Sequence, residues 1–311
     1  MNQIVNFSPI YTVFTPTFNR AHTLHRVFNS LVAQTYRDFE WIVIDDGSTD
    51  NTQSLIKSWQ QQADFPIHYH YQVNSGKHIA YNNAVKLAHG ELFLVIDSDD
   101  GFVVNALERM LYWWENISNN QRDSFTGIVT LCQDENGNLC GVPFAQSPLD
   151  TNALDLRYKH KIRAETWGFH RTAVLKQFPF PEDANVRFVP ENIVWDAIAR
   201  QYKIRCINEP LRIFYQDLTV RLTKANPKNK ARVKHYFLQM LNRDFSYAIH
   251  DPKSFIKWAV LYVRYSIHLG DIGFMQPSKF KNLGAYLLCI LSLPLGFLVY
   301  VKDKLTSLKP S

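Results

Sequence analysis

The sequence predicts an α/β fold in which a mostly parallel sheet carries helices on both faces. Along the first third of the chain, short apolar runs rich in β-branched and aromatic residues alternate with segments of helical apolar spacing. Such alternation is typical of strand–helix–strand units, which build a parallel sheet between two helical layers. The expected strands are residues 10–15, 39–44, 67–73 and 92–96, and the expected helices are 20–35, 51–59, 78–88 and 103–117.

The second half of the chain has weaker periodicity. A break at Glu209-Pro210 interrupts its last apolar stretch. In chain order we expect a strand at 127–132, irregular chain at 133–165, a helix at 191–202, and strands at 203–208 and 211–216.

Composition excludes several classes of protein. The 311 residues are 46% hydrophobic and 20% charged, which supports a packed core and excludes wholesale disorder. The four cysteines are widely spaced and the eleven histidines form no zinc-binding pattern, so we expect neither a disulfide framework nor a zinc site. The first residues lack the basic and apolar segments of a secretory signal.

Charge divides the chain into two parts. Residues 1–220 carry 19 basic and 24 acidic side chains, a net charge of −5, whereas residues 221–311 carry 15 basic and 4 acidic side chains. We therefore expect one domain over residues 1–220 and a basic helical region over residues 221–311. An acidic domain followed by a basic C-terminal region, the basic tail, indicates a polyanionic partner, either nucleic acid or an anionic membrane.

Polar residues gather where three of the expected strands end. The three clusters lie at residues 15–17, 45–46 and 97–100. In open α/β sheets, ligands bind outside the carboxyl ends of the strands. We therefore expect the three clusters to converge on one edge of the sheet.

Asp97, Asp99 and Asp100 place three carboxylates within four residues. Carboxylates this close raise one another's pKa unless a cation neutralises them, and oxygen ligands suit Mg²⁺ or Mn²⁺ with phosphate oxygens. The cluster is therefore either a metal–diphosphate site or an acidic loop that caps the next helix. Asp45 and Asp46 either bind a nucleobase or ribose, or belong to a turn.

Together these motifs resemble the family 2 glycosyltransferases of the GT-A fold. The resemblance covers about 100 residues, and the order and spacing of its motifs are specific. It is carried by TPTFNR (15–20), QTYRDFEW (34–41), VIDDGSTD (43–50), NSGK (74–77), NNA (82–84), GE (90–91) and VIDSDD (95–100).

The resemblance implies a nucleotide-diphosphate sugar donor, bound by a half of the domain at about 8–117. Pro16, Phe18 and Asp46 match positions that hold the base and ribose. Lys77 is otherwise an ordinary lysine at a helix start, and Trp167 is otherwise a core residue. The expected donor-binding residues are Pro16, Phe18, Asn19, Asp45, Asp46, Lys77, Asp97 and Trp167.

The resemblance also implies a divalent cofactor, Mn²⁺ or Mg²⁺. Asp97, Asp99 and Asp100 match the family's DXD metal site, and the sequence leaves open which of them binds the ion directly. The ion would neutralise the leaving diphosphate as the sugar–phosphate bond breaks.

Relatives invert the sugar's anomeric centre, so one carboxylate suffices to take the proton of the acceptor hydroxyl. The resemblance places this base at the start of a helix in the acceptor half, at about 125–220. Many relatives have Glu-Asp where this chain has Glu191-Asn192, so Glu191 is the expected base and Asp196 the second candidate. Glu191 could instead be a favourable charge in a first helical turn.

The basic tail holds two segments suited to a membrane. Residues 253–269 place a basic face opposite an aromatic and aliphatic face on a helical wheel, which suits either a membrane interface or packing on the catalytic domain. Residues 283–301 are 19 consecutive residues without a charge, interrupted by Pro294 and Gly296 and flanked by lysines. They predict a broken helix that dips into one leaflet, and they favour membrane over nucleic acid as the partner.

The sequence thus predicts an inverting, metal-dependent glycosyltransferase of bacterial surface-polysaccharide assembly. It would act at the cytoplasmic face of the inner membrane on a glycan or a polyprenyl-diphosphate-linked acceptor. One alternative is a phosphatase of the haloacid-dehalogenase type, which also carries Asp-x-Asp after a strand. Another is a non-catalytic, membrane-tethered carbohydrate-binding protein, for which the acidic cluster would be unnecessary.

Overall fold

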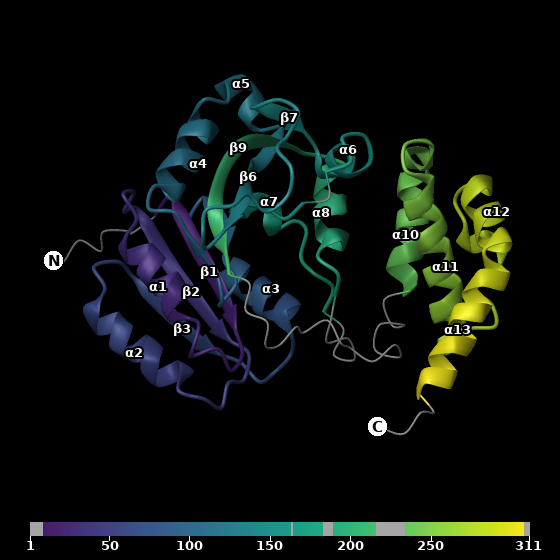
Figure 1. The fold of residues 1–311 in the computed structure, drawn as a ribbon, viewed down its shortest axis with the longest axis horizontal. Helices are drawn as coiled ribbons and strands as arrows, with labels where there is room; N and C mark the ends of the chain where they lie inside the picture. Colours follow the sequence, from purple (N-terminus) through teal and green to yellow (C-terminus); the bar gives the residue numbers. More distant parts are fainter. Residues whose placement is uncertain (1–8, 163, 183–188, 216–233, 308–311) are drawn as a thin grey trace. The chain divides into compact units, whose positions relative to one another are not determined.

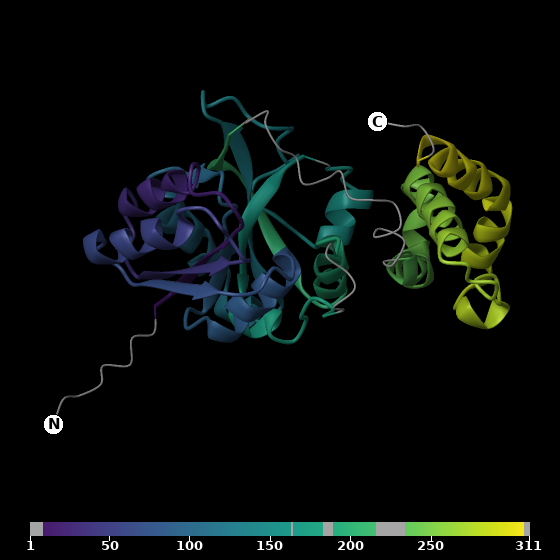
Figure 2. The same ribbon diagram turned by 90° about the horizontal axis from the view of Figure 1, so that it is seen from below.

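The structure is a computed structural model that describes residues 9–162, 164–182, 189–215 and 234–307 (Figures 1 and 2). Most of the basic run at 221–234 lies outside the described residues. The described chain forms two compact units. The first comprises residues 9–162, 164–182 and 190–215, and the second comprises residue 189 and residues 234–307.

A sheet of nine strands runs through the described part of the first unit, in the order β3-β2-β1-β4-β8-β6-β9-β5, with β7 paired to β9. β1, β2, β3 and β4 are mutually parallel, whereas β8 is antiparallel to both β4 and β6. The strands are β1 (Tyr11–Thr17), β2 (Phe39–Asp45), β3 (Ile67–Tyr71), β4 (Leu92–Val95), β5 (Gly101–Phe102), β6 (Phe125–Asp134), β7 (Leu149–Thr151), β8 (Thr166–Arg171) and β9 (Lys203–Phe214).

Helices lie on both faces of the sheet, as Figure 2 shows. Side chains alternate between the faces of a strand, and Tyr11 and Val13 point into the larger core while Phe14 points to the other face. On that second face, the Tyr81 ring contacts Phe14 with ring centroids 5.8 Å apart. The helices of this unit are α1 (His25–Val32), α2 (Thr52–Gln62), α3 (Lys77–Leu87), α4 (Ala106–Glu115), α5 (Asn119–Arg122), α6 (Ala153–Tyr158), α7 (Thr172–Leu175) and α8 (Asn192–Ala199).

The predicted α/β fold is confirmed, and the sheet is mixed rather than mostly parallel. β8, β5 and β7 each pair antiparallel with a neighbour. The break expected at Glu209-Pro210 is wrong, because β9 continues through it and absorbs the irregularity as register shifts against β6. Within 133–165, expected to be irregular, the structure has β7 and α6.

The second unit consists of helices, and α11 (Pro252–His268) packs against α10 (Lys234–Asp244) and α13 (Leu293–Ser307) (Figure 1). The aromatic face expected for this segment is buried, with Phe255 and Tyr262 in the core of the unit. Part of the expected basic face is also used internally. Arg264 donates two hydrogen bonds of 2.7 Å to Asp303 of α13, and His268 lies 2.8 Å from the same carboxylate.

The uncharged segment 283–301 forms α12 (Leu283–Leu291) and the first part of α13, as a broken helix. The break falls at Ser292 rather than at Pro294, which lies in the first turn of α13, where a missing amide hydrogen costs little. In the described chain, no single helix has the length and apolar character needed to cross a membrane. α12 and α13 meet these criteria only as a pair, which is bent by 50°.

Candidate active site

The carboxyl ends of β1, β2 and β4 meet at one edge of the sheet because these strands run parallel. β6 runs in the same direction as β4, because both are antiparallel to β8. β9 is parallel to β6, so it ends at this edge as well. We call the ends of these four strands the carboxyl edge. It brings together Thr17, Asp45, Asp97 and Arg212, so the predicted convergence of the three polar clusters is confirmed.

Asp100 is buried at the carboxyl edge, where its carboxylate is held by neighbouring residues of the chain. Its carboxylate accepts a hydrogen bond from Arg212 Nε at 3.0 Å and one from the Tyr215 backbone amide at 3.4 Å. Burial raises the pKa of Asp100 to about 6, and the Arg212 guanidinium opposes that rise. Because its oxygens are engaged and only 2% of its side chain is exposed, Asp100 is poorly placed to bind a metal ion.

Asp97 and Asp99 are the more accessible members of the acidic cluster, each with 38% of its side chain exposed. Asp97 lies 3.5 Å from Arg212 Nη2, and Asp99 lies 4.0 Å from Arg20 Nη2. The backbone carbonyl of Asp99 accepts a hydrogen bond of 3.0 Å from Arg26, which fixes the loop. In the described ranges, no group of three or more His, Cys, Asp or Glu side chains is arranged to hold a metal ion.

Lys77 joins two of the predicted site residues. Its Nζ lies 2.8 Å from Asp97 Oδ1 and 2.9 Å from Glu191 Oε1. Burial alone would raise the pKa of Asp97, but the charges of Lys77 and Arg212 outweigh it and lower that pKa. Burial would likewise lower the pKa of Lys77, and the two carboxylates reverse this and raise it. Glu191, at the start of α8, keeps 52% of its side chain exposed.

Asp46 holds the loop between β3 and α3. Its carboxylate accepts hydrogen bonds from Gln72 Nε2 and the Ser75 amide, both at 2.7 Å, and from the Gly76 amide at 2.9 Å. Asp46 is buried, with 7% of the residue exposed. Asp46 therefore shapes the loop that carries Lys77, and its predicted contact with a nucleotide stays a prediction.

Asp45 and Asn19 order the turn that follows β2. Asp45 accepts hydrogen bonds of 2.7 Å from the Ser48 amide and the Tyr69 hydroxyl. Asn19 has a positive φ of 54°. Its backbone amide donates a hydrogen bond to Ser48 Oγ, and its Oδ1 accepts one from the Thr49 amide, each at 2.8 Å. The loops after β1 and β2 are thus tied into one surface.

Phe18 is the exposed aromatic of this surface, with 43% exposure. The neighbouring Pro16 is partly buried at the end of β1. An open ring beside hydrogen-bonding loops suits stacking on a nucleobase. The location of Phe18 is therefore compatible with the predicted donor site.

The structure places two predicted site residues in the interior. The Trp167 indole is 6% exposed, donates to the Val95 carbonyl at 2.5 Å, and packs against Phe102 with ring centroids 5.5 Å apart. Asp196 is 1% exposed and pairs with Arg157 at 2.7 Å. Burial leaves Trp167 little ring surface for a sugar, and it favours Glu191 over Asp196 as the base.

Sequence reasoning missed Arg212, which anchors the acidic cluster from more than 100 residues away. One signal was available: Arg212 stands alone as a charge in the apolar run from Leu211 to Phe214. A charged residue in a buried strand generally requires a partner. Thr17 belongs to the polar cluster predicted at 15–17, but the sequence assigned it no role of its own. Its hydroxyl is buried at the carboxyl edge, and it has no hydrogen-bond partner within the described residues.

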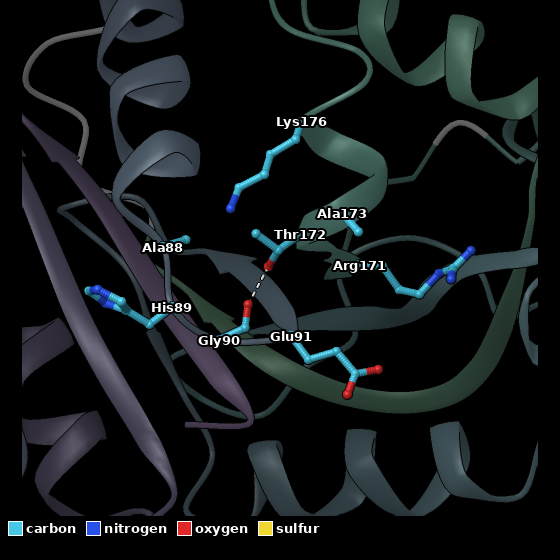
Figure 3. A pocket seen from close by; sticks show the side chains of 8 residues that line it. All are labelled: Ala88, His89, Gly90, Glu91, Arg171, Thr172, Ala173 and Lys176. Carbon is cyan, nitrogen blue, oxygen red and sulfur yellow. Dashed lines mark hydrogen bonds between the residues drawn. The ribbon is translucent and has the colours of Figure 1, made fainter. Parts of the chain in front are cut away.

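A hollow of about 330 Å³ lies away from the carboxyl edge, beside the start of β4 and the end of β8 (Figure 3). Thr172 closes one side by donating a hydrogen bond of 2.5 Å to the Gly90 carbonyl. The charged ends of Arg171 and Lys176 point away from one another in this view. Because its polar groups do not converge, the hollow lacks the features of a polar ligand site.

A family model described as glycosyl transferase family 2 matches residues 12–171, which is more than half of the chain. The chain belongs to glycosyl transferase family 2. The match contains α3, β4, the acidic cluster and all of β1 except Tyr11, so the resemblance seen in the sequence is confirmed. The phosphatase and the non-catalytic carbohydrate-binding protein are set aside as hypotheses.

Curated relatives agree with the family. An uncharacterised glycosyltransferase of Nostoc, alr2836, is 37% identical over 100 residues, covering 32% of this chain and 31% of the relative. The putative teichuronic acid biosynthesis glycosyltransferase TuaG of Bacillus subtilis is 31% identical over 132 residues, covering 42% and 51%. The chain thus spans from about a third to about half of the length of these relatives.

Solved structures share the fold. S. aureus TarS (residues 1–349) in complex with UDP-GlcNAc has a TM-score of 0.60 and 20% identity, covering 92% of this chain and 80% of the other. Mannosyltransferase PcManGT from Pyrobaculum calidifontis, in complex with GDP-Man and Mn²⁺, has a TM-score of 0.55 and 16% identity, covering 96% and 85%. These similarities establish the GT-A fold of the chain.

Proposed function

We propose that this protein transfers a sugar from a nucleotide-diphosphate donor to a hydroxyl group of a glycan or a polyprenyl-diphosphate-linked glycan. The observation that carries the proposal is the meeting of Asp97, Asp99 and Glu191 at one edge of the sheet. All three carboxylates are partly exposed, and Lys77 links Asp97 to Glu191. The site therefore offers groups for a diphosphate and a base for an acceptor.

The nature of the donor is supported by two similar structures. TarS was solved with UDP-GlcNAc and with UDP, and PcManGT with GDP-Man. In this chain, the carboxylates of Asp45 and Asp46 accept hydrogen bonds from the Ser48 and Ser75 amides and order the loops after β2 and β3. Phe18 stands exposed in the loop after β1. We infer that these loops bind the nucleoside, without assigning the base or the sugar.

The acidic residues fit a divalent ion of the Mn²⁺ or Mg²⁺ type. Such ions prefer oxygen ligands, and Mg²⁺ usually takes only one or two protein carboxylates besides phosphate and water. Asp99 and Asp97 meet this requirement because their carboxylates are accessible, whereas Asp100 is engaged by Arg212. When bound, the ion would neutralise charge on the departing diphosphate.

In this proposal Glu191 takes the proton from the acceptor hydroxyl as that oxygen attacks the sugar. One base is sufficient for a single displacement, which inverts the anomeric centre. Glu191 suits the role because it is exposed and lies at the start of a helix. Arg20 and Lys77, both near the acidic loop, would hold the phosphate oxygens of the donor.

The test uses a panel of sugar nucleotides that includes UDP-GlcNAc and GDP-mannose, each with Mn²⁺. Thermal shift measures donor binding, and release of the nucleoside diphosphate measures turnover. We expect Glu191→Gln to retain binding and to lose about 10²- to 10⁴-fold in turnover. The matched control is Asp123→Asn, which removes an exposed carboxylate at the end of α5 and should resemble wild type. Unchanged turnover in Glu191→Gln would assign the base elsewhere.

We also propose that the second unit binds the cytoplasmic surface of an anionic membrane. The uncharged segment exposes a run of apolar side chains between lysine pairs at 279 and 281 and at 302 and 304. Apolar helices with basic flanks bind membrane interfaces through both burial and charge. The most exposed members are Leu283, Leu291, Phe297 and Leu298.

Sedimentation with vesicles of phosphatidylglycerol and phosphatidylcholine tests this proposal with the full chain. The double substitution Leu291→Glu and Leu298→Glu should reduce the bound fraction at least tenfold. Ile272→Glu changes an apolar residue that is 99% exposed outside the segment, and it should leave binding nearly unchanged. Equal binding by all three proteins would disprove the assignment of the membrane surface.

A further inference from the structure

Lys77 is the residue that touches both halves of the proposed reaction. Its Nζ contacts Asp97 at 2.8 Å, on the side assigned to the donor diphosphate, and Glu191 at 2.9 Å, the proposed base. An ammonium group has three hydrogens to donate, so both contacts can be made at once. Both ion pairs are partly exposed to solvent. Ion pairs of this kind are weak, so a charged ligand can replace one of the partners.

The backbone of Lys77 is fixed by the donor-side loop. Gly76, just before it, has a φ of +99°, a conformation that side chains disfavour. The amides of Ser75 and Gly76 are held by the carboxylate of Asp46 at the end of β2. A ligand that moves this loop therefore also moves Lys77.

The helix that begins at Lys77 is also joined to the chain on the acceptor side. Asn82 of α3 donates to the Phe180 carbonyl at 2.8 Å and accepts from the Phe180 amide at 2.9 Å. Farther along the chain, Trp195 of α8 packs against Tyr81 with ring centroids 6.0 Å apart. α3 thus spans from the donor loop to α8, the helix that carries Glu191 at its start.

We propose that Lys77 is a positioning residue that couples donor binding to the release of Glu191. Without a donor it holds Glu191 against Asp97, and a bound diphosphate attracts its ammonium and leaves Glu191 open to the acceptor. Phosphate oxygens compete well for this ammonium because charge-assisted hydrogen bonds to them are strong. The proposal rests on the proposed function and adds to it a residue, Lys77, through which the bound donor acts on the base.

Hydrogen exchange of full-length protein tests the coupling directly. Mass spectrometry would follow residues 190–199 before and after adding UDP or GDP with Mn²⁺. In wild type we expect a severalfold rise in exchange at the first turn of α8 when a nucleotide binds. Lys77→Met should show this raised exchange without nucleotide and change little on adding it.

Two further variants separate coupling from general loosening. Lys77→Arg retains a cation that can bridge two carboxylates, so it should restore most of the nucleotide response. Lys86→Met removes a cation from the same helix, one that pairs with Glu182 at 3.3 Å, and it should respond like wild type. A lost response in Lys86→Met as well would show that any change in α3 has this effect, and would overturn the proposal.

Kinetics supply a second readout. In sugar-nucleotide cleavage, Lys77→Met should raise the KM for the donor about tenfold and lower kcat by a smaller factor, because Glu191 remains present. If wild type binds nucleotide without any change in α8 exchange, the coupling is disproved while the proposed function stands. If no nucleotide binds to wild type in the thermal-shift assay, the proposed function fails with it.

Discussion

The two edges of the sheet use carboxylates in opposite ways. At the carboxyl edge, Asp97 and Glu191 are partly exposed and share one cation, Lys77. At the other edge, where β2 begins, Glu40 is fully buried and accepts hydrogen bonds from Thr12 Oγ1 at 2.6 Å and the His89 amide at 2.8 Å.

The difference shows how the fold separates chemistry from stability. Partners that share an exposed cation can be exchanged for a ligand at little cost. A buried carboxylate with several fixed donors cannot change partners without a large loss of stability. Substitutions at the carboxyl edge should therefore alter activity, and substitutions at Glu40 should alter folding.

The largest expected effect is on activity at the carboxyl edge. Asp99→Ala should reduce release of nucleoside diphosphate by at least about 10³-fold, since an ion that stabilises the leaving group contributes several kcal/mol. Its urea midpoint should stay close to that of wild type because the side chain is exposed. A variant that is inactive because it is unfolded would break the comparison between the edges.

The next effect is on stability at the opposite edge. Glu40→Ala leaves the buried Thr12 hydroxyl and the partly buried His89 amide without their acceptor, so it should destabilise the first unit by about 3 kcal/mol. Urea denaturation monitored by tryptophan fluorescence measures this loss. Donor binding by the fraction that remains folded should be preserved. A loss below about 1 kcal/mol would contradict the structural role of Glu40.

Lowering the pH should remove the stability that the Glu40 carboxylate contributes. Burial would raise the pKa of Glu40, but hydrogen bonds from His68, Thr12 and His89 outweigh it and lower the pKa to about 2. The unfolded chain therefore binds more protons than the folded one between about pH 4.5 and pH 2. The stability from Glu40 is complete above about pH 4.5 and is lost as the pH falls toward 2.

Comparing wild type with Glu40→Gln isolates this effect, because the amide does not titrate. The urea midpoint of wild type should fall more steeply than that of Glu40→Gln below pH 4.5. Parallel pH profiles of the two proteins would show that the carboxylate has its usual pKa.

The smallest expected effect sharpens the contrast. Lys77→Met removes two ion pairs at the carboxyl edge, yet the free energy of unfolding should change by less than about 1 kcal/mol, because both pairs are partly exposed. Thermal or urea unfolding checks this value. A loss as large as that of Glu40→Ala would show that Lys77 supports the fold as well as the site.

Local patterns in the sequence were enough to predict the donor half of the fold. The strands from 10 to 96 and the polar clusters at their ends follow from apolar periodicity and from the geometry of parallel sheets. The start of α8 next to Glu191 also agrees with the predicted helix. These features depend on residues close together in the chain.

Long-range pairing explains what the sequence could not provide. β8 was not predicted as a strand, because Thr166–Arg171 becomes one only between β4 and β6. The ion pair of Asp100 with Arg212 joins residues 112 positions apart. A lone charge in an apolar run indicates that Arg212 needs a partner, but no local pattern identifies Asp100 as that partner. Trp167 was assigned to a sugar because aromatic residues suit both a sugar face and a core, and only the fold distinguishes them.

The arginine near the end of β9 also bears on how this protein can be divided into fragments. Arg212 holds the carboxylate of Asp100, and β9 supplies the backbone partners of Gly101 and Phe102. A fragment that stops after α4 would contain every acidic residue of the loop, together with Lys77 and Arg20, but neither the arginine that pairs with Asp100 nor the strand that pairs with Gly101 and Phe102. The part of the chain that ends with α4 is consequently not an independent module, and fusions or truncations that preserve the loop need the chain to continue through residue 215.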